Sequence, residues 1–370
     1  MKYAGKIMFF LLVIASVMVL AFMPLSQVSA KPLTKEEAVK YGKEIAAELQ
    51  ENMAETLVKQ MLIPCLTEKK AKIHENLLAF ANSHPEVAQK HSSFQIKGMV
   101  NQLVSMMPQL ADQLTTQIAP VLEDFAPRYS GISSHQGKQW IIIRNECSED
   151  IVYFMIYCEK DTNGEICIKD FINPSTGETP IDTFIHTMTE NIKTAWAQEA
   201  GIVYESKVKY LQQIAMASAY GQMALVIDIY ESHFQEDASF NIAAAASYLN
   251  ALIANSSKDI SAEEQKKIDA HAARVRRLAP DYVGIEMLLI DHNIQCARFE
   301  EALASIEKTR RIIGEDAYLD VLEGLIYMSS EEDEKAAAAF KMAKKKDLQY
   351  PMFLELYRLH SMAYPELYQD

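Results

Sequence analysis

The sequence contains few residues of the kinds that build catalytic loops. Its 370 residues include 12 Gly, 12 Pro, 2 Trp and 9 His. No Gly-rich phosphate-binding loop appears among so few glycines, which argues against a nucleotide-binding enzyme. The histidines are scattered, and His74-Glu75 lacks the second His that a zinc-binding helix carries one turn later. We therefore expect a protein that is not an enzyme and that uses no cofactor.

Positive charge is also scarce, because 36 Lys and Arg are set against 50 Asp and Glu, for a net charge of −14 at pH 7. A protein that binds nucleic acid through the phosphate backbone needs clustered cations, and an acidic surface is equally unsuited to anionic lipid. We expect no nucleic-acid partner. The 49% hydrophobic content is ordinary for a globular chain, and its length leaves room for two domains.

Residues 1–30 have the composition of a secretory signal peptide. Lys2 and Lys6 supply a positive start, residues 7–23 form an uncharged apolar core, and Val28-Ser29-Ala30 offers a small-residue cleavage site. We expect a secreted or periplasmic protein of the cell envelope, with no stable membrane insertion after cleavage. The alternative is an uncleaved anchor, because an apolar core of about 17 residues is near the lower limit for crossing a bilayer.

The chain from Thr34 to about Arg128 shows helical periodicity. Thr34 and Glu37 form a capping-box pattern at its start. Pro64 is predicted to end the first helix and Thr67 to cap the second, since proline lacks the backbone N–H that a helix interior needs. Interruptions of a later helical stretch are predicted at two further prolines, Pro108 and Pro120.

Three short segments rich in Ile, Val, Phe and Tyr then predict strands, at 139–144, 151–158 and 165–172. The last two are predicted to form a hairpin around the turn residues 161–164. We expect a three-stranded antiparallel sheet at about 139–172, which packs with the preceding helices in an α+β domain from 31 to 200.

The hairpin also resembles a calcium-binding loop. Side chains that carry oxygen stand at the spacing of such a loop: Glu159, Asp161, Asn163 and Asp170. Gly164 occupies the place where that loop turns sharply, but strands instead of helices flank it. A plain hairpin turn also wants Gly here, because Gly takes a positive φ without strain. We favour the plain turn and keep the metal site as the alternative.

Five cysteines are an odd number for an exported chain: Cys65, Cys147, Cys158, Cys167 and Cys296. A turn at 161–164 sets Cys158 directly opposite Cys167, and cross-strand neighbours lie close enough for a disulfide. The pair is a candidate disulfide. Two buried thiols on one face of the sheet are the alternative.

Helical periodicity resumes beyond residue 179 and continues almost to the C-terminus. The candidate helices are 180–199, 205–219, 222–234, 239–254, 261–278, 281–296, 298–312, 316–328, 332–345 and 350–362. The array from about 205 onward is predicted to stack as helical hairpins, each of which buries its apolar face against its neighbours.

Two of these hairpins are similar to one another. The repeated positions are Ala302, Ile306 and Thr309 in one copy and Ala336, Phe340 and Ala343 in the next. Gly324 and Tyr327 precede the second copy, with Gly324 twelve residues before Ala336. This set, and its period of about 34 residues, resembles the tetratricopeptide repeat over about 70 residues of the chain. Asp320 and Glu323 depart from the pattern, since the family prefers Trp and Leu there.

The resemblance implies a tetratricopeptide-like array over 201–370, whose concave surface holds a peptide or a helix of another protein. Together these patterns predict a mainly α protein that is exported and serves protein–protein interaction or assembly. Two alternatives remain. The α+β domain could instead hold a small apolar ligand in an enclosed cavity behind residues 140–158, or the chain could be an unrecognised envelope hydrolase.

Cleavage of the signal peptide is directly measurable. We expect the protein isolated from its native host to begin at Lys31, because Val28-Ser29-Ala30 is the cleavage pattern that follows the apolar core. Intact-mass spectrometry of the purified protein checks this. Recovery of the full 370-residue chain from the membrane fraction would favour the anchor instead.

Overall fold

The computed structural model describes residues 31–370 except for 136, 147–150, 162, 175–179, 238–239, 257–259, 281, 347–349 and 370. The predicted signal peptide and Cys147 therefore lie outside the described residues. The described chain is mainly α-helical with one small antiparallel sheet, which confirms the predicted fold class.

The N-terminal half holds the sheet and the helices that precede and follow it. Its elements are β1 (Lys31–Pro32), α2 (Lys35–Glu55), the π-helix η1 (Thr56–Leu62), α3 (Ile63–Glu68), α4 (Lys70–Ser83), α5 (Pro85–Ala88), α6 (Ser93–Leu122), β2 (Ala126–His135), β3 (Lys138–Glu146), β4 (Ile151–Lys160), β5 (Ile166–Ile172) and α7 (Pro180–Ala200).

The C-terminal half is the helical array. Its elements are α8 (Val208–Ala219), α9 (Met223–His233), α10 (Ile242–Asn255), α11 (Ala262–Leu278), α12 (Gly284–Gln295), α13 (Phe299–Ile313), α14 (Ala317–Ser329), α15 (Asp333–Lys345), α16 (Pro351–Ala363) and the 3₁₀ turn η3 (Pro365–Tyr368). Helices α7 to α16 lie within a few residues of the ten predicted ranges. Among the described residues, no helix is both long and apolar enough to cross a membrane.

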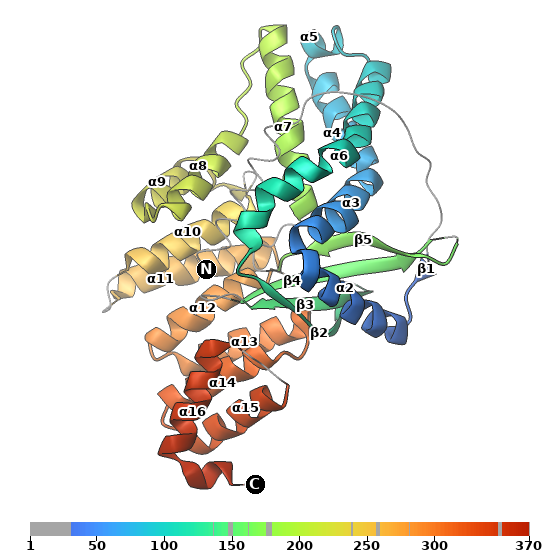
Figure 1. Ribbon diagram of the computed structural model, residues 1–370. Coiled ribbons are helices and arrows are strands. Elements are labelled where there is room, and N and C mark those ends of the chain that lie inside the picture. The colour runs from blue at the N-terminus through green and yellow to red at the C-terminus, as the bar shows by residue number, and fades with distance from the viewer. Residues whose placement is uncertain are drawn as a thin grey trace.

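The sheet lies between the N-terminal helices and the array (Figure 1). Strand β4 pairs with β3 along one edge and with β5 along the other, while β2 extends the sheet beyond β3. Because successive side chains on a strand point to opposite faces, each strand supplies two cores. Ile143 and Phe154 pack on the N-terminal helices, whereas Ile142 and Met155 pack on the array. The sheet thus joins the two halves through a core on each face.

Strand β2 was not predicted, and the helical segment ends earlier than predicted. Helix α6 stops at Leu122 instead of continuing to about Arg128, and β2 begins at Ala126. The strand includes Ser130-Gly131 and Ser133-Ser134, residues that are typical of turns. The register shifts between Tyr129 and Gly131, so a bulge accommodates part of this turn-like sequence within the sheet.

The predicted effects of three prolines are wrong. Pro64 does not end the helical run, because the π-helical turn η1 comes directly before it and α3 follows without a break; the kink in this run lies at Asn52 instead. A wider turn leaves more room between a proline ring and the preceding carbonyls. Pro108 and Pro120 both lie inside α6, which remains one helix. Lys69 stands at the start of α4, and the Thr67 hydroxyl instead donates to the Ile63 carbonyl at 3.1 Å.

A buried polar cluster joins the sheet to the array. Arg144 of β3 donates from Nη1 to Asp316 at 2.7 Å and from Nη2 to Glu146 at 2.8 Å. The Tyr153 hydroxyl donates to the second oxygen of Asp316 at 2.6 Å, and Ser130 also donates to this carboxylate. Arg144, Tyr153 and Asp316 are all buried. The division at residue 200 stays a prediction, but the two halves share these contacts and a core.

The cluster predicts a large stability loss on truncation of Asp316. Removing one partner of a buried charge pair costs about 3–5 kcal/mol, so Asp316→Ala should lower the free energy of unfolding by about that amount. The neighbouring Glu315 is 68% exposed in its ion pair with Arg310, and Glu315→Ala should cost less than about 1 kcal/mol. Urea denaturation measures both. Equal losses in the two variants would contradict the assignment.

Candidate binding surface

Among the described residues of the array, one backbone turn recurs in three hairpins. Helices α8 and α9, α12 and α13, and α14 and α15 are each joined by a turn in which an N–H donates to a carbonyl five residues earlier. The donors are Gln222, Arg298 and Glu332, and the N–H···O distance is 2.8 Å in every case. This is the Schellman arrangement, which satisfies carbonyls at the end of a helix. The three hairpins therefore share the same local geometry.

The residue before each donor has a left-handed backbone. These residues are Gly221, Ala297 and Glu331, with φ of 70°, 53° and 62°. The interval from Ala297 to Glu331 equals the interval from Ala302 to Ala336 in the sequence repeat. A left-handed turn is usually marked by Gly, and sequence reasoning missed these two because Ala and Glu stand there. The backbone thus supports the repeat independently of the side chains.

The repeat residues lie where paired helices come closest. A Cβ added to Gly324 of α14 would lie 2.3 Å from the Phe340 ring of α15, so only Gly fits. The small or aromatic side chains at the crossing are fully buried: Ala302, Ala336, Phe340 and Ala343. Tyr327 is half-buried, with the Lys335 amine 5.3 Å above its ring. The tetratricopeptide assignment stays a prediction, and these contacts have the form that it expects.

Buried acids stand at the positions where the tetratricopeptide pattern prefers an aromatic residue. Glu286 and Asp320 occupy equivalent places in successive repeat units, and each is paired with an Arg ten residues earlier. Arg276 binds Glu286 through two nitrogens at 2.7 Å each, whereas Arg310 lies 3.6 Å from Asp320. Lys346 also reaches Asp320 at 2.8 Å. A buried ion pair thus recurs with the repeat.

The two acids differ in their pKa. Burial alone would raise both, because a carboxylate loses its hydration. Hydrogen bonds from Arg276 and Ser305 outweigh burial at Glu286, so its pKa lies below the ordinary value. Burial raises the pKa of Asp320, and the hydrogen bond from Lys346 offsets this only in part. The longer Arg310 contact fits the weaker stabilisation of the Asp320 charge.

The Asp161 side chain organises the described part of the turn between β4 and β5. Asp161 accepts backbone N–H bonds from Asn163 and Glu165 at 2.8 and 2.9 Å, and Gly164 has a φ of 85°. Glu159 accepts from the Tyr157 hydroxyl, and Asp170 pairs with Lys69 at 3.2 Å. The side chains of Glu159, Asp161 and Asp170 thus bind three different sets of partners. Among the described residues, no group of three or more His, Cys, Asp or Glu is arranged to hold a metal.

The predicted register of the cysteines is wrong by one residue. Cys158 lies opposite Ile168, while Cys167 lies opposite Glu159, because Lys160 at the end of β4 pairs with Ile166 and not with Glu165 as predicted. Both residues carry thiols in the structure, and burial raises the pKa of Cys158 to about 12. The loop of the hairpin is thus one residue longer than predicted, and the bulge between Tyr157 and Cys158 lies farther from the turn than these pairs. A disulfide between them stays a prediction.

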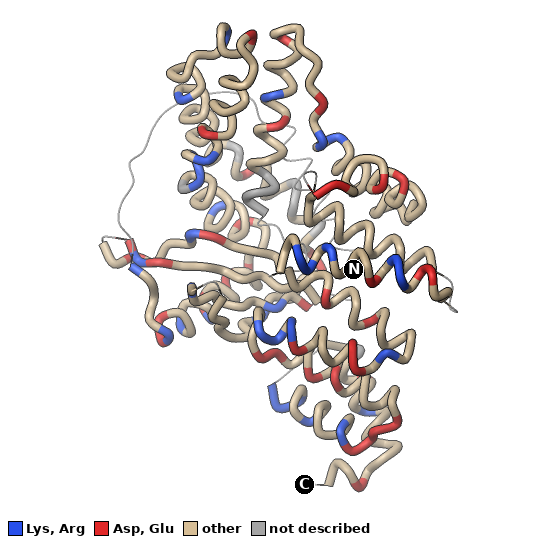
Figure 2. Tube along the Cα trace, turned by 180° about the vertical axis from the view of Figure 1, so that it is seen from behind, with Lys and Arg blue, Asp and Glu red and all other residues tan. Residues whose placement is uncertain are grey.

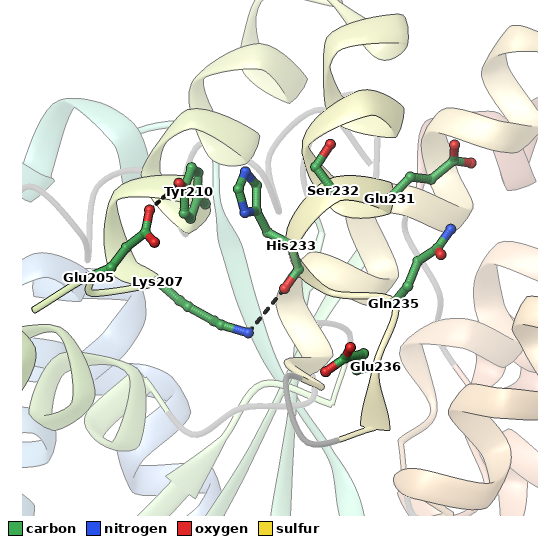
Figure 3. Close-up of a pocket in the computed structure, with 8 residues that line it drawn as sticks. All are labelled: Glu205, Lys207, Tyr210, Glu231, Ser232, His233, Gln235 and Glu236. Atoms are coloured by element: carbon green, nitrogen blue, oxygen red, sulfur yellow. Dashed lines mark hydrogen bonds between the residues drawn. The ribbon is translucent and has the colours of Figure 1, made fainter.

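A polar pocket of about 330 Å³ lies at the first hairpin of the array (Figure 3). Its lining comes from the residues before and within α8 and from the end of α9: Glu205, Lys207, Tyr210, Glu231, Ser232, His233, Gln235 and Glu236. The Tyr210 ring stacks on the His233 imidazole with centroids 3.5 Å apart. Lys207 donates to the His233 carbonyl at 3.1 Å. The pocket was not predicted, because its residues follow no motif.

The lining favours binding over catalysis. Three glutamates and one lysine line it, and Glu205 and Glu231 are paired with Lys209 and Lys267 at 2.8 and 2.6 Å. The hydrogen bond from Lys209 lowers the pKa of Glu205, and that from Lys267 lowers the pKa of Glu231, so both are carboxylates at neutral pH. In Figure 3 the Ser232 hydroxyl points away from the His233 ring, which does not set the pair up as nucleophile and base.

Comparison of the chain with protein-family models, with curated proteins and with solved structures gives no match. The candidate surface therefore rests on the geometry of the described residues alone.

The turn geometry predicts stability changes of opposite sign for two kinds of substitution. Ala297→Gly and Glu331→Gly should each raise the free energy of unfolding by about 1 kcal/mol, because a left-handed backbone costs a non-Gly residue about 1–2 kcal/mol. Gly324→Ala should lower it by about 1–3 kcal/mol, since its Cβ meets the Phe340 ring. Urea unfolding curves give the sign of each change. A destabilised Glu331→Gly protein would contradict the shared turn.

Proposed function

We propose that the protein is an exported, non-catalytic interaction or assembly protein of the periplasm or extracellular space. It holds a peptide or a helix of a partner protein on its tetratricopeptide-like array. The observation that carries the proposal is the repeated hairpin, since the pairs α8–α9, α12–α13 and α14–α15 share one turn geometry at Gly221, Ala297 and Glu331. Stacked pairs of this kind build an extended surface for another chain.

The inner row of the array supports this use. Helix α8 contacts α10, α10 contacts α12, and α12 contacts α14, so alternate helices lie side by side along the array. The core of α8 to α11 contains no strand residue, whereas the core around α12 to α15 includes the sheet. The first two hairpins are therefore the part of the row that the sheet leaves uncovered, and the pocket lies there.

The charge of the pocket favours a basic side chain from the partner. Glu205 and Glu236 are exposed there, and a positively charged Lys or Arg of the partner would complement their carboxylates, with Glu205 giving up its pair with Lys209. A volume of about 330 Å³ accommodates one or two side chains of an extended or helical peptide. The pocket would thus anchor a Lys or Arg while the rest of the peptide follows the inner helices.

The alternative ligand site behind residues 140–158 has less support. Trp140 and Tyr153 are buried against the array, and Ile141 and Phe154 are buried against the N-terminal helices. Side chains from both layers thus fill the space on each side of the sheet. A small apolar ligand would have to displace this packing, at a cost comparable to removing core contacts.

Panning a random peptide-display library against the purified protein tests the proposal. We expect enrichment of peptides that contain Lys or Arg, with binding that weakens as salt rises, because charge attraction at an exposed pocket is screened. The double variant Glu205→Lys/Glu236→Lys should weaken binding of the enriched peptides at least about tenfold. Isothermal titration calorimetry on synthetic copies gives the affinities.

A matched control separates the pocket from total charge. The double variant Glu48→Lys/Glu51→Lys makes an equal change of charge at two exposed positions of α2, outside the array, and should leave peptide affinity unchanged. Equal weakening by this control would show a general charge effect and remove the pocket from the proposal. Failure to enrich any peptide would count against peptide binding by the array as a whole.

A further inference from the structure

The last helix of the array presents an apolar outer face. On α16, Phe353 and His360 are buried against the preceding hairpin. Leu354 is 45% exposed, Leu359 is 50% exposed and Met362 is 68% exposed. Solenoids normally end in a helix with a polar outer face, because an apolar end invites association. Figure 1 shows α16 at the free end of the array, near the C-terminus.

Two charged residues lie on the same face. Glu355 and Arg358 form an ion pair at 2.6 Å within the helix, and their side chains are 55% and 54% exposed. At 100° per residue, these two and the three apolar side chains span an arc of about 140° on one side of the helix. The outer face therefore combines a central acid–base pair with flanking apolar groups.

Four of these five residues are symmetric about the midpoint between residues 356 and 357, and Met362 has Pro351 as its counterpart. In an antiparallel copy of α16 that shares this midpoint, Leu354 lies at the height of Leu359, and Glu355 lies at the height of Arg358. Glu355 of each copy would then lie level with Arg358 of the other, and Leu354 of each copy would lie level with Leu359 of the other. A twofold interface requires this kind of self-complementarity.

We propose that α16 is a self-association surface, through which two copies of this chain pair antiparallel about a twofold axis at residues 356–357. Glu355 and Arg358 exchange their internal ion pair for two reciprocal pairs between copies, so no charge is left alone. Leu354, Leu359 and Met362 leave water on association. The pairing would join two arrays at their ends and leave the pocket at α8 and α9 accessible in each.

One helix face is a small interface, so the dimer should be weak. Stable dimers bury about 800 Å² or more on each partner, and a contact of this size belongs to the transient class. We expect sedimentation velocity of the purified protein to show a reversible monomer–dimer equilibrium over a series that reaches about 200 μM. A protein that remains monomeric across the series would overturn the proposal.

Charge reversal tests the orientation. Glu355→Arg places two bases on the face and Arg358→Glu places two acids, so each variant alone should dimerise at least about tenfold more weakly than the unaltered protein. An equimolar mixture should recover dimerisation, because every Arg then meets a Glu of the other variant. The double variant Glu355→Arg/Arg358→Glu should also dimerise. Circular dichroism checks that each variant is folded.

Three outcomes would exclude this surface. Single variants that associate as well as the unaltered protein would place the contact elsewhere. A mixture that associates no better than its components would exclude the reciprocal ion pairs. Met342→Lys on α15, which alters an exposed apolar residue outside the α16 face, is the matched control and should leave dimerisation unchanged. Loss of dimerisation in that control would also contradict the proposal.

Discussion

The buried carboxylate of Asp316 is the interaction on which the arrangement of the two halves depends. Asp316 is the residue before α14, and its carboxylate accepts a hydrogen bond from the Tyr318 backbone N–H at 2.8 Å. The same carboxylate accepts hydrogen bonds from the Arg144 and Tyr153 side chains of the sheet. One side chain thus starts an array helix and fixes the sheet against it. Because a buried charge tolerates few geometries, this contact sets the position of the strands relative to α12–α15 more narrowly than apolar packing would.

Charge also orders the array along its length. Figure 2 shows acids and bases interleaved over its helices, and many are paired between neighbours, such as Lys267 with Glu231 and Arg298 with Asp269. Exposed pairs of this kind contribute little stability. Their effect is on register, since a helix displaced by one turn would bring like charges together. The net negative charge of the chain is therefore compatible with close helix stacking.

The helices of the array were predictable because their apolar period and small crossing residues are local signals, as at Gly324 and Ala336. The effect of Pro64 could not be predicted, because a π-helical turn removes the steric conflict that normally ends a helix. The cysteine register depended on the length of the hairpin loop, and β2 is held by pairing with β3 despite its turn-forming residues. The pocket was missed since Glu205 and Glu236 come together only through the α8–α9 hairpin.

The recurring Arg–acid pair restricts the lengths of the insertions and deletions that the array can accept. Arg276 with Glu286 and Arg310 with Asp320 each cross from one hairpin to the next, so both carboxylates are paired with an Arg of the unit before them. Removing or duplicating one whole repeat unit in frame would preserve a matching partner at each junction. An insertion of another length would leave a buried acid facing the wrong side chain. Evolution of this surface by change in repeat number is thereby restricted to whole units.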